Sequence, residues 1–170
     1  MILGDIELGR TIKIGVREYL VVGKGYDTTS VISKDIIINM EFGESNDYKE
    51  SKIRTYLNEE FISELELYVD ERDLVPHRIH LIADDGTNKD DSCCDQISLI
   101  TADLYRRYRK YIPPIGRSWW TATPKSKMDD WLRNVCHVYS DGVLDWHYCV
   151  WSCGVRPFFV LRSSMADFAI

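Results

Sequence analysis

Apolar residues follow strand-like spacing at both ends of this chain and helix-like spacing between them, and this order constrains the fold more than any other sequence feature. Four short β-rich runs, separated by turn residues, fall at residues 11–14, 18–22, 28–33 and 36–40. Four aromatic and β-branched runs follow at residues 117–123, 135–140, 143–150 and 155–161. Asp141-Gly142 predicts a hairpin turn between two of them. Strands grouped at the two ends predict an α+β domain with an antiparallel sheet, because a parallel sheet would need strands that alternate with helices.

The middle of the chain predicts two helical regions, of which the first covers residues 51–67. Apolar side chains recur there at every fourth position, at Ile53, Leu57, Phe61 and Leu65. Asn58 precedes Glu59 and Glu60, a pattern typical of an N-cap followed by an acidic first turn. We therefore expect two consecutive short helices in this region.

The second helical region is predicted to start after Thr101, a suitable N-cap, and to place Leu104, Tyr108 and Ile112 on one face. The Pro-Pro-Ile-Gly stretch at residues 113–116 should end it. Between the two regions, residues 70–95 are polar and irregular apart from an apolar run at 79–82. We expect a long surface excursion there.

The composition is that of one folded domain covering residues 1–170. Hydrophobic residues make up 45% and charged residues 28% of the chain, which excludes a disordered composition. The net charge of −6 disfavours nucleic acid and anionic lipid as partners. No basic leader and no apolar run near the roughly 18 residues of a membrane helix is present, so we expect a cytoplasmic protein with reduced thiols. The five cysteines are Cys93, Cys94, Cys136, Cys149 and Cys153.

Several motifs together resemble the DUF6273 family, an uncharacterised bacterial and phage-associated domain. They are Ser51-x-x-Arg54-x-x-Leu57-Asn58-x-x-Phe61, Ser98-Leu99-Ile100-Thr101, the WWTATP run at 119–124, Asp141-Gly142 and the GVRPFFVL run at 154–161. The resemblance covers nearly the whole chain and keeps the motif order. The DUF6273 family is in turn distantly similar to the C-type-lectin-like fold, which formylglycine-generating enzymes share with the variable proteins of diversity-generating retroelements.

Three polar residues of these motifs are expected to be structural. Arg54 and Asn58 belong to the first helical motif, and Arg156 directly precedes Pro157. A proline that lacks a donor should lie at a strand start, an edge or a bulge. Arg156 beside it could hold a loop through a charge-assisted hydrogen bond to a carboxylate.

Large aromatic side chains are concentrated in the last third of the chain. They are Trp119, Trp120, Trp131, Tyr139, Trp146, Tyr148 and Trp151. If residues 145–153 form one strand, aromatics occupy both of its faces, and an open sheet can bury only one. We therefore expect at least two rings to be exposed and to bind a ligand. The variable proteins place their binding residues before the final strand, and the resemblance thus implies a site between 131 and 151, with Arg133 and Asp145 as polar partners.

Metal sites have weaker support. Cys136 and His137 are adjacent and would point to opposite faces of a strand, while Cys149 and Cys153 would lie roughly 13 Å apart on a flat strand. Zinc bonds of about 2 Å cannot span that distance. Formylglycine-generating enzymes imply a copper-binding cysteine pair near the C-terminus, and Cys149 and Cys153 are weak candidates for it.

Two charged segments are interpreted as solvated surface. The acidic run at residues 84–91 does not follow the order of an EF-hand loop. The basic run at residues 106–111 places Tyr108 on the apolar helix face, which leaves the cations on an ordinary exposed face and makes nucleic-acid binding an unfavoured interpretation.

The sequence thus predicts a non-catalytic module that needs no cofactor and binds a protein or a small molecule. Nucleophile elbows, Walker loops, dinucleotide fingerprints and zinc-protease motifs are absent from the sequence. Two alternatives remain: a copper-dependent oxidase of the formylglycine-generating kind, and a phage-encoded inhibitor that binds a host protein through its acidic surface.

Overall fold

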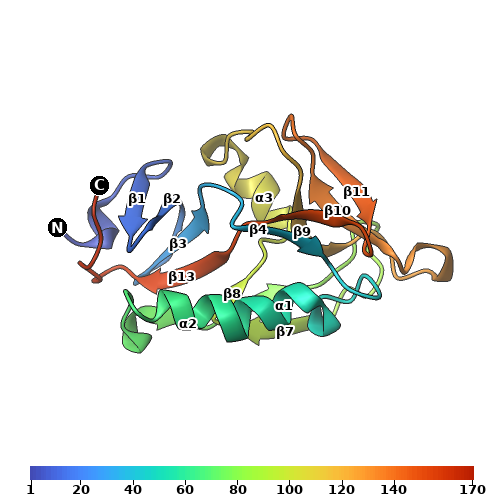
Figure 1. Ribbon diagram of the computed structural model, residues 1–170, viewed down its shortest axis with the longest axis horizontal. Coiled ribbons are helices and arrows are strands. Elements are labelled where there is room, and N and C mark those ends of the chain that lie inside the picture. The colour runs from blue at the N-terminus through green and yellow to red at the C-terminus, as the bar shows by residue number, and fades with distance from the viewer.

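The computed structural model describes residues 1–170 and contains two main sheets, between which the chain passes more than once (Figure 1). The six-stranded sheet has the order β1-β2-β3-β13-β5, and β8 also pairs with β13. Its strands are β1 Thr11–Ile14, β2 Arg17–Lys24, β3 Thr28–Ser33, β5 Leu74–Val75, β8 Ile97–Ser98 and β13 Phe158–Arg162. All its pairs are antiparallel, as the grouping of strand-like runs predicted.

The five-stranded sheet has the order β11-β10-β9-β12-β4. Its strands are β4 Ile38–Glu41, β9 Trp119–Pro124, β10 Asn134–Val138, β11 Leu144–Tyr148 and β12 Ser152–Val155. Only the pair of β12 with β9 is parallel. A separate hairpin of β6 His77–His80 and β7 Ser92–Asp95 lies in the segment that was expected to be irregular. The polar composition of residues 70–95 concealed it, because this hairpin buries few side chains.

The predicted strand at residues 155–161 is in fact two strands in two sheets. Arg156 and Pro157 separate β12 from β13, so the chain passes here from the five-stranded to the six-stranded sheet. Arg156 is buried and structural, but its partners are carbonyls and not a carboxylate. Its Nε donates to the Ser33 carbonyl at 2.9 Å and its Nη2 to the Lys34 carbonyl at 3.0 Å. Burial lowers the pKa of Arg156 to about 10.

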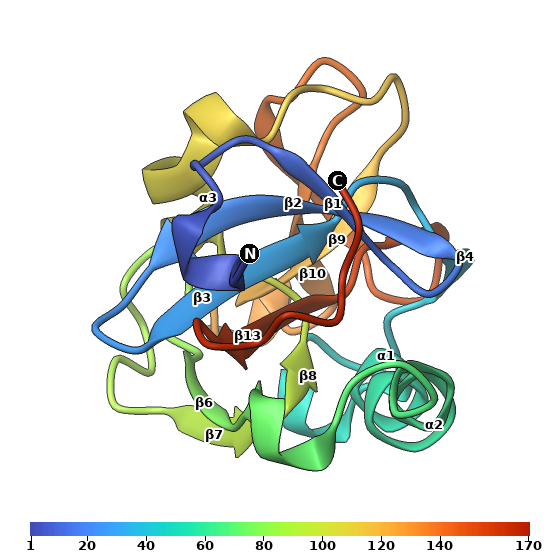
Figure 2. The same cartoon turned by 90° about the vertical axis from the view of Figure 1, so that its left-hand side faces the viewer.

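Helical segments cover opposite sides of the sheets (Figures 1 and 2). α1 Lys52–Tyr56, a π-helical turn at Leu57–Phe61 and α2 Ile62–Leu65 form one continuous rod, and α3 Ala102–Tyr108 lies on the other side. Single 3₁₀ turns occur at Leu3–Asp5, Tyr48–Glu50, Glu71–Asp73, Arg109–Tyr111 and Asp129–Trp131. None of the helices combines the length and the apolar content needed to cross a bilayer.

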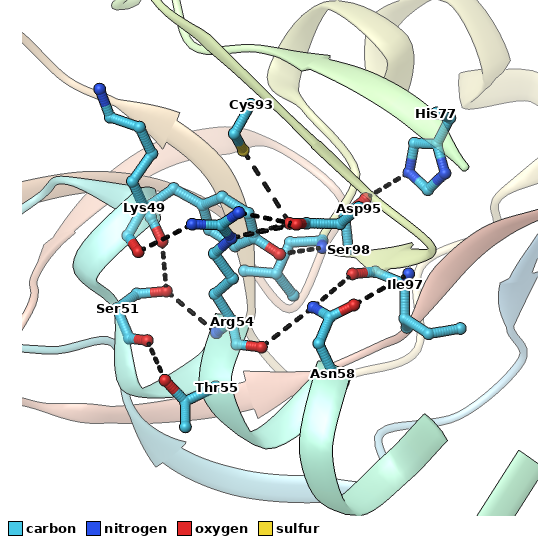
Figure 3. A network of polar contacts seen from close by, with 12 residues as sticks. Lys49, Ser51, Arg54, Thr55, Asn58, His77, Cys93, Asp95, Ile97 and Ser98 are labelled. Atoms are coloured by element: carbon cyan, nitrogen blue, oxygen red, sulfur yellow. Dashed lines mark hydrogen bonds and ion pairs between the residues drawn. The ribbon is translucent and has the colours of Figure 1, made fainter. Parts of the chain in front are cut away.

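Asn58 does not begin a second helix, which corrects the expectation of a helix break. Tyr56 and Leu57 keep helical backbone angles, and the chain continues through the π-helical turn. The Asn58 side chain donates to the carbonyls of Arg54 and Ile97 and accepts from the Ile97 amide, so it links the rod to β8 (Figure 3).

Arg54 fastens the same rod to β7 (Figure 3). Its Nη2 contacts Asp95 Oδ1 at 2.8 Å, its Nε contacts Oδ2 at 2.9 Å, and its Nη1 donates to the Lys49 carbonyl. Such a bidentate pair fixes orientation as well as distance. Arg54 and Asn58 are therefore structural in this molecule, as the motif predicted.

Two buried apolar clusters hold the layers together. The larger one packs the rod against the inner faces of both sheets, with the stripe Ile53, Leu57, Phe61 and Leu65 buried as predicted. The smaller one lies beneath α3. Thr101 caps α3 as expected, but Tyr105 is its most buried ring, and Leu104 and Tyr108 are only partly buried. The helical phase is therefore turned by one residue from the prediction.

Candidate functional site

Seven rings form an unbroken chain of contacts across β10, β11 and the segments beside them, and we call this set the aromatic chain. Successive ring centroids are 5.9, 5.6, 5.2, 4.8, 5.2 and 6.0 Å apart, and most pairs meet edge to face. Its members, in order of contact, are Trp131, Trp146, Tyr148, Trp151, His147, His137 and Tyr139. Separations of 4.5–7 Å are those at which aromatic pairs attract.

Four members of the aromatic chain are exposed to solvent. Trp151 is 54% exposed, Tyr139 50%, Tyr148 42% and Trp131 40%. The expectation that at least two rings would be free is confirmed. The aromatic chain contacts the core through Trp120, whose ring centre lies 5.8 Å from that of His147. The exposed rings are therefore held in place by their neighbours and by the core before any ligand arrives.

The β10–β11 hairpin positions most of these rings. Its turn is at Asp141-Gly142, as predicted, and Gly142 has a φ of +89°, which favours glycine. Pairing sets His137 opposite Asp145 and Cys136 opposite Trp146, so the histidines and the Trp146–Tyr148 pair belong to opposite faces of the strands. The strand ends at Tyr148, not at residue 153. The turn that follows carries Trp151, which contacts both His147 and Tyr148 and so connects the two faces.

Trp131 reaches the aromatic chain from the 3₁₀ turn at Asp129–Trp131. The buried amide of Asn46 secures this turn, because its Nδ2 donates to the carbonyls of Ser126, Trp131 and Asn134 at 2.8, 3.1 and 3.2 Å. Nothing in the sequence motifs pointed to Asn46, since the residue lies far from the aromatic segment along the chain.

A shallow, open groove of about 640 Å³ lies beside the aromatic chain. Its lining is mostly polar and comprises Asn39, Gly116, Arg117, Ser118, His137, Tyr139, Ser140, Asp145, Trp146, His147, Ser152 and Cys153. The two histidine rings stack nearly parallel, with 7° between their planes. Burial, and then the neighbouring His147, lower the pKa of His137 to about 4, and burial also lowers the pKa of His147. Both rings are therefore neutral at pH 7 and can donate and accept hydrogen bonds.

The outer edge of β11 carries two features that disfavour strand addition. Asp145 Oδ1 accepts from the Trp146 amide at 2.8 Å, and a charged side chain on an edge strand discourages pairing with another strand. This edge therefore favours a ligand that contacts rings and groove groups over one that extends the sheet.

Trp119 and Trp120 are buried and cannot contact a ligand, which corrects their assignment to the site. Trp119 packs edge to face on Tyr105 and lies beneath the Arg156 guanidinium, whereas the Trp120 Nε1 donates to the Met40 carbonyl at 2.9 Å. They occupy a central strand that is covered on both faces, so each fills one of the two apolar clusters. The sequence could not distinguish a central strand from an edge strand.

The remaining predicted residues lie at the rim of this region or beneath it. Asp145 and Arg133 are exposed, and the Arg133 guanidinium makes no ion pair. Cys149 is buried in the turn after β11, and Cys153 is buried in β12, with its Sγ 3.9 Å from His137 Nδ1. Burial raises the pKa of both thiols, that of Cys153 to about 11. No group of three or more His, Cys, Asp or Glu side chains is arranged to hold a metal ion.

Comparison with known proteins adds no family or fold assignment. No protein-family model matches the chain, and neither a curated protein nor a solved structure does. The resemblance drawn from the motifs therefore stays a prediction, and any inference about function rests on geometry and chemistry alone.

Proposed function

We propose that this protein is a non-catalytic binding module whose recognition surface is the aromatic chain with the adjoining groove. The lectin-like scaffold that the motifs imply belongs to the same proposal. The observation that carries it is the unbroken contact of seven rings, four of which are exposed, at one edge of the five-stranded sheet. Exposed large rings in contact with one another mark interaction sites, whereas single exposed rings do not.

The rings are suited to binding because they are already ordered. When a partner covers Tyr148 and Trp151, these rings lose little side-chain entropy, because they already meet each other edge to face. Trp151 is further restricted by His147, and Tyr148 by Trp146. Tryptophan and tyrosine are also the residues most often found at binding hot spots, where truncation costs about 2 kcal/mol or more.

The groove adds hydrogen-bonding groups at low desolvation cost. Neutral, partly exposed His147 and the exposed Asn39 amide can orient a polar ligand without the cost of stripping water from a charge. Asp145 and Arg117 add one charge of each sign at the groove. The surface thus favours a neutral polar partner, a protein or a small molecule, over a polyanion such as nucleic acid.

Truncation of the two most accessible central rings tests the proposal. The double variant Tyr148→Ala/Trp151→Ala and the control Tyr26→Ala would be immobilised beside the wild type. Tyr26 is the most exposed aromatic residue, and it lies outside the aromatic chain. Each would be presented with bacterial lysate and with an array of purified oligosaccharides, and retained ligands would be quantified.

We expect at least one ligand that the wild type and Tyr26→Ala retain equally and that the double variant retains at least tenfold less. Unchanged circular dichroism would show that the double variant is folded. Ligands retained equally by all three proteins would refute the aromatic chain as the recognition surface.

A further inference from the structure

A second hollow, unrelated to the aromatic chain, lies between β6 and α3 and has a volume of about 470 Å³. β6 and α3 lie on the same side of the molecule, toward the left in Figure 2. The lining comprises His77, Arg78, Ile79, His80, Ile82, Lys89, Ser98, Leu99, Thr101, Asp103, Leu104, Arg107 and Phe158. A volume of this size is within the range that accommodates one small molecule.

Three cations at this hollow lack a carboxylate partner. Arg78, Lys89 and Arg107 are exposed and take part in none of the ion pairs of the molecule. Asp103 is the only acid in the lining, and its carboxylate accepts from Arg106 Nη1 at 2.7 Å. The protein as a whole carries a net charge of −6, so this cluster of unpaired positive charges is opposite in sign to the net charge. It creates a local field that attracts anions.

The floor of the hollow is apolar and rigid. Phe158 and Leu99 are buried at its base, and the His77 ring meets Phe158 edge to face with 5.5 Å between centroids. His77 Nε2 and Ser98 Oγ share a hydrogen bond of 2.8 Å (Figure 3). β8, which carries Ser98, is tied to the helical rod by Asn58. The base of the hollow is thus formed before a ligand enters.

We propose that this hollow binds a small organic phosphate whose apolar body rests on Phe158 and Leu99 while its phosphate group contacts Arg78, Lys89 and Arg107. Three positive charges match a phosphate dianion better than a single carboxylate. Arginine forms paired hydrogen bonds to phosphate oxygens, and lysine adds a point charge. Arg78 is already oriented along the hairpin, because its Nη1 donates to Ser92 Oγ at 3.2 Å.

Phenyl phosphate is a suitable probe, because it joins one aromatic body to one phosphate group. Isothermal titration calorimetry on the full chain should detect its binding, with inorganic phosphate binding at least fivefold more weakly and the neutral analogue benzyl alcohol not binding. Arg78→Gln and Arg107→Gln should each weaken phenyl phosphate at least tenfold. Arg72→Gln is the matched control, since Arg72 is exposed, pairs with Asp70 and lies outside the hollow.

Two results would overturn the proposal. One is that no binding of phenyl phosphate is detected at a probe concentration on the order of 10 mM, which is near the weakest useful affinities. The other is that the wild type and both arginine variants bind phenyl phosphate with equal affinity. Equal affinity for inorganic phosphate would remove the apolar floor from the site and would likewise overturn it. The variant Tyr148→Ala/Trp151→Ala should keep full affinity for phenyl phosphate, because the aromatic chain is a separate surface.

Discussion

Trp119 and Trp120 lie on β9, in the middle of the five-stranded sheet, whereas Trp146 and Tyr148 lie on β11, at its edge. The first pair is sealed beneath helices and neighbouring strands. Tyr148 is open to solvent, and Trp146 is only partly covered. The same kind of side chain therefore serves stability at one position and is available for recognition at the other. The difference comes from the place of the strand in the sheet, because only a central strand is covered on both faces.

The largest expected effect tests the buried side of this comparison. Trp120→Ala removes a fully buried ring that supports His137 and His147, and it should lower the free energy of unfolding by about 3–5 kcal/mol. Urea denaturation followed by circular dichroism would measure it. A loss below about 1 kcal/mol would mean that the ring is not packed as described.

Two histidines, the buried His137 and the partly buried His77, should make stability depend on pH, and each lies at a different one of the two hollows. Burial lowers the pKa values of His77 and His137 to about 4, from an ordinary value near 6.5. The unfolded chain therefore takes up protons at a pH at which the folded chain does not. The contribution of the two histidines to the free energy of unfolding is fully present above about pH 6.5 and is lost as the pH falls toward 4.

Between pH 7 and pH 5 the decline should be about 3–4 kcal/mol for the two histidines together. Urea denaturation at several pH values would measure the slope. His137→Gln should remove roughly half of it, and a slope unchanged by that substitution would show that His137 is not protected from protonation.

Asn58 joins the helical rod to β8 and so supports the floor of the hollow between β6 and α3. Asn58→Ala leaves the Ile97 amide and carbonyl without this partner and should cost about 1–2 kcal/mol of unfolding free energy. Glu59→Ala, one position along the same helix on the exposed face, is the matched control and should cost little. Equal effects of the two substitutions would show that the link to β8 contributes nothing.

The smallest expected effect tests the exposed side of the comparison. Tyr148→Ala/Trp151→Ala removes two large rings, yet it should lower the free energy of unfolding by less than about 1 kcal/mol, since both rings already contact water. Thermal denaturation beside Tyr26→Ala would measure the difference. A loss as large as that of Trp120→Ala would mean that the rings belong to the core and would weaken their assignment to recognition.

Local patterns predicted several elements because neighbouring residues specify them. β1 and β3 match the predicted runs, Thr101 caps α3, and the Asp141-Gly142 turn joins β10 to β11. The hairpin β6–β7 was missed because its composition is polar, and the helix break at Asn58 was wrong because a link to β8 replaces the cap. A residue that satisfies a backbone group distant in sequence cannot be distinguished from a cap by its immediate neighbours.

By itself, the sequence determined the α+β class, the antiparallel character of the sheets and the excess of aromatic residues over what one face of a sheet can bury, since all three depend on short-range spacing and composition. Only the tertiary structure decided which rings are free. Sheet order makes β9 central and β11 an edge, and packing gathers Arg78, Lys89 and Arg107 around one hollow. These outcomes depend on contacts between residues far apart in the chain, which no local pattern encodes.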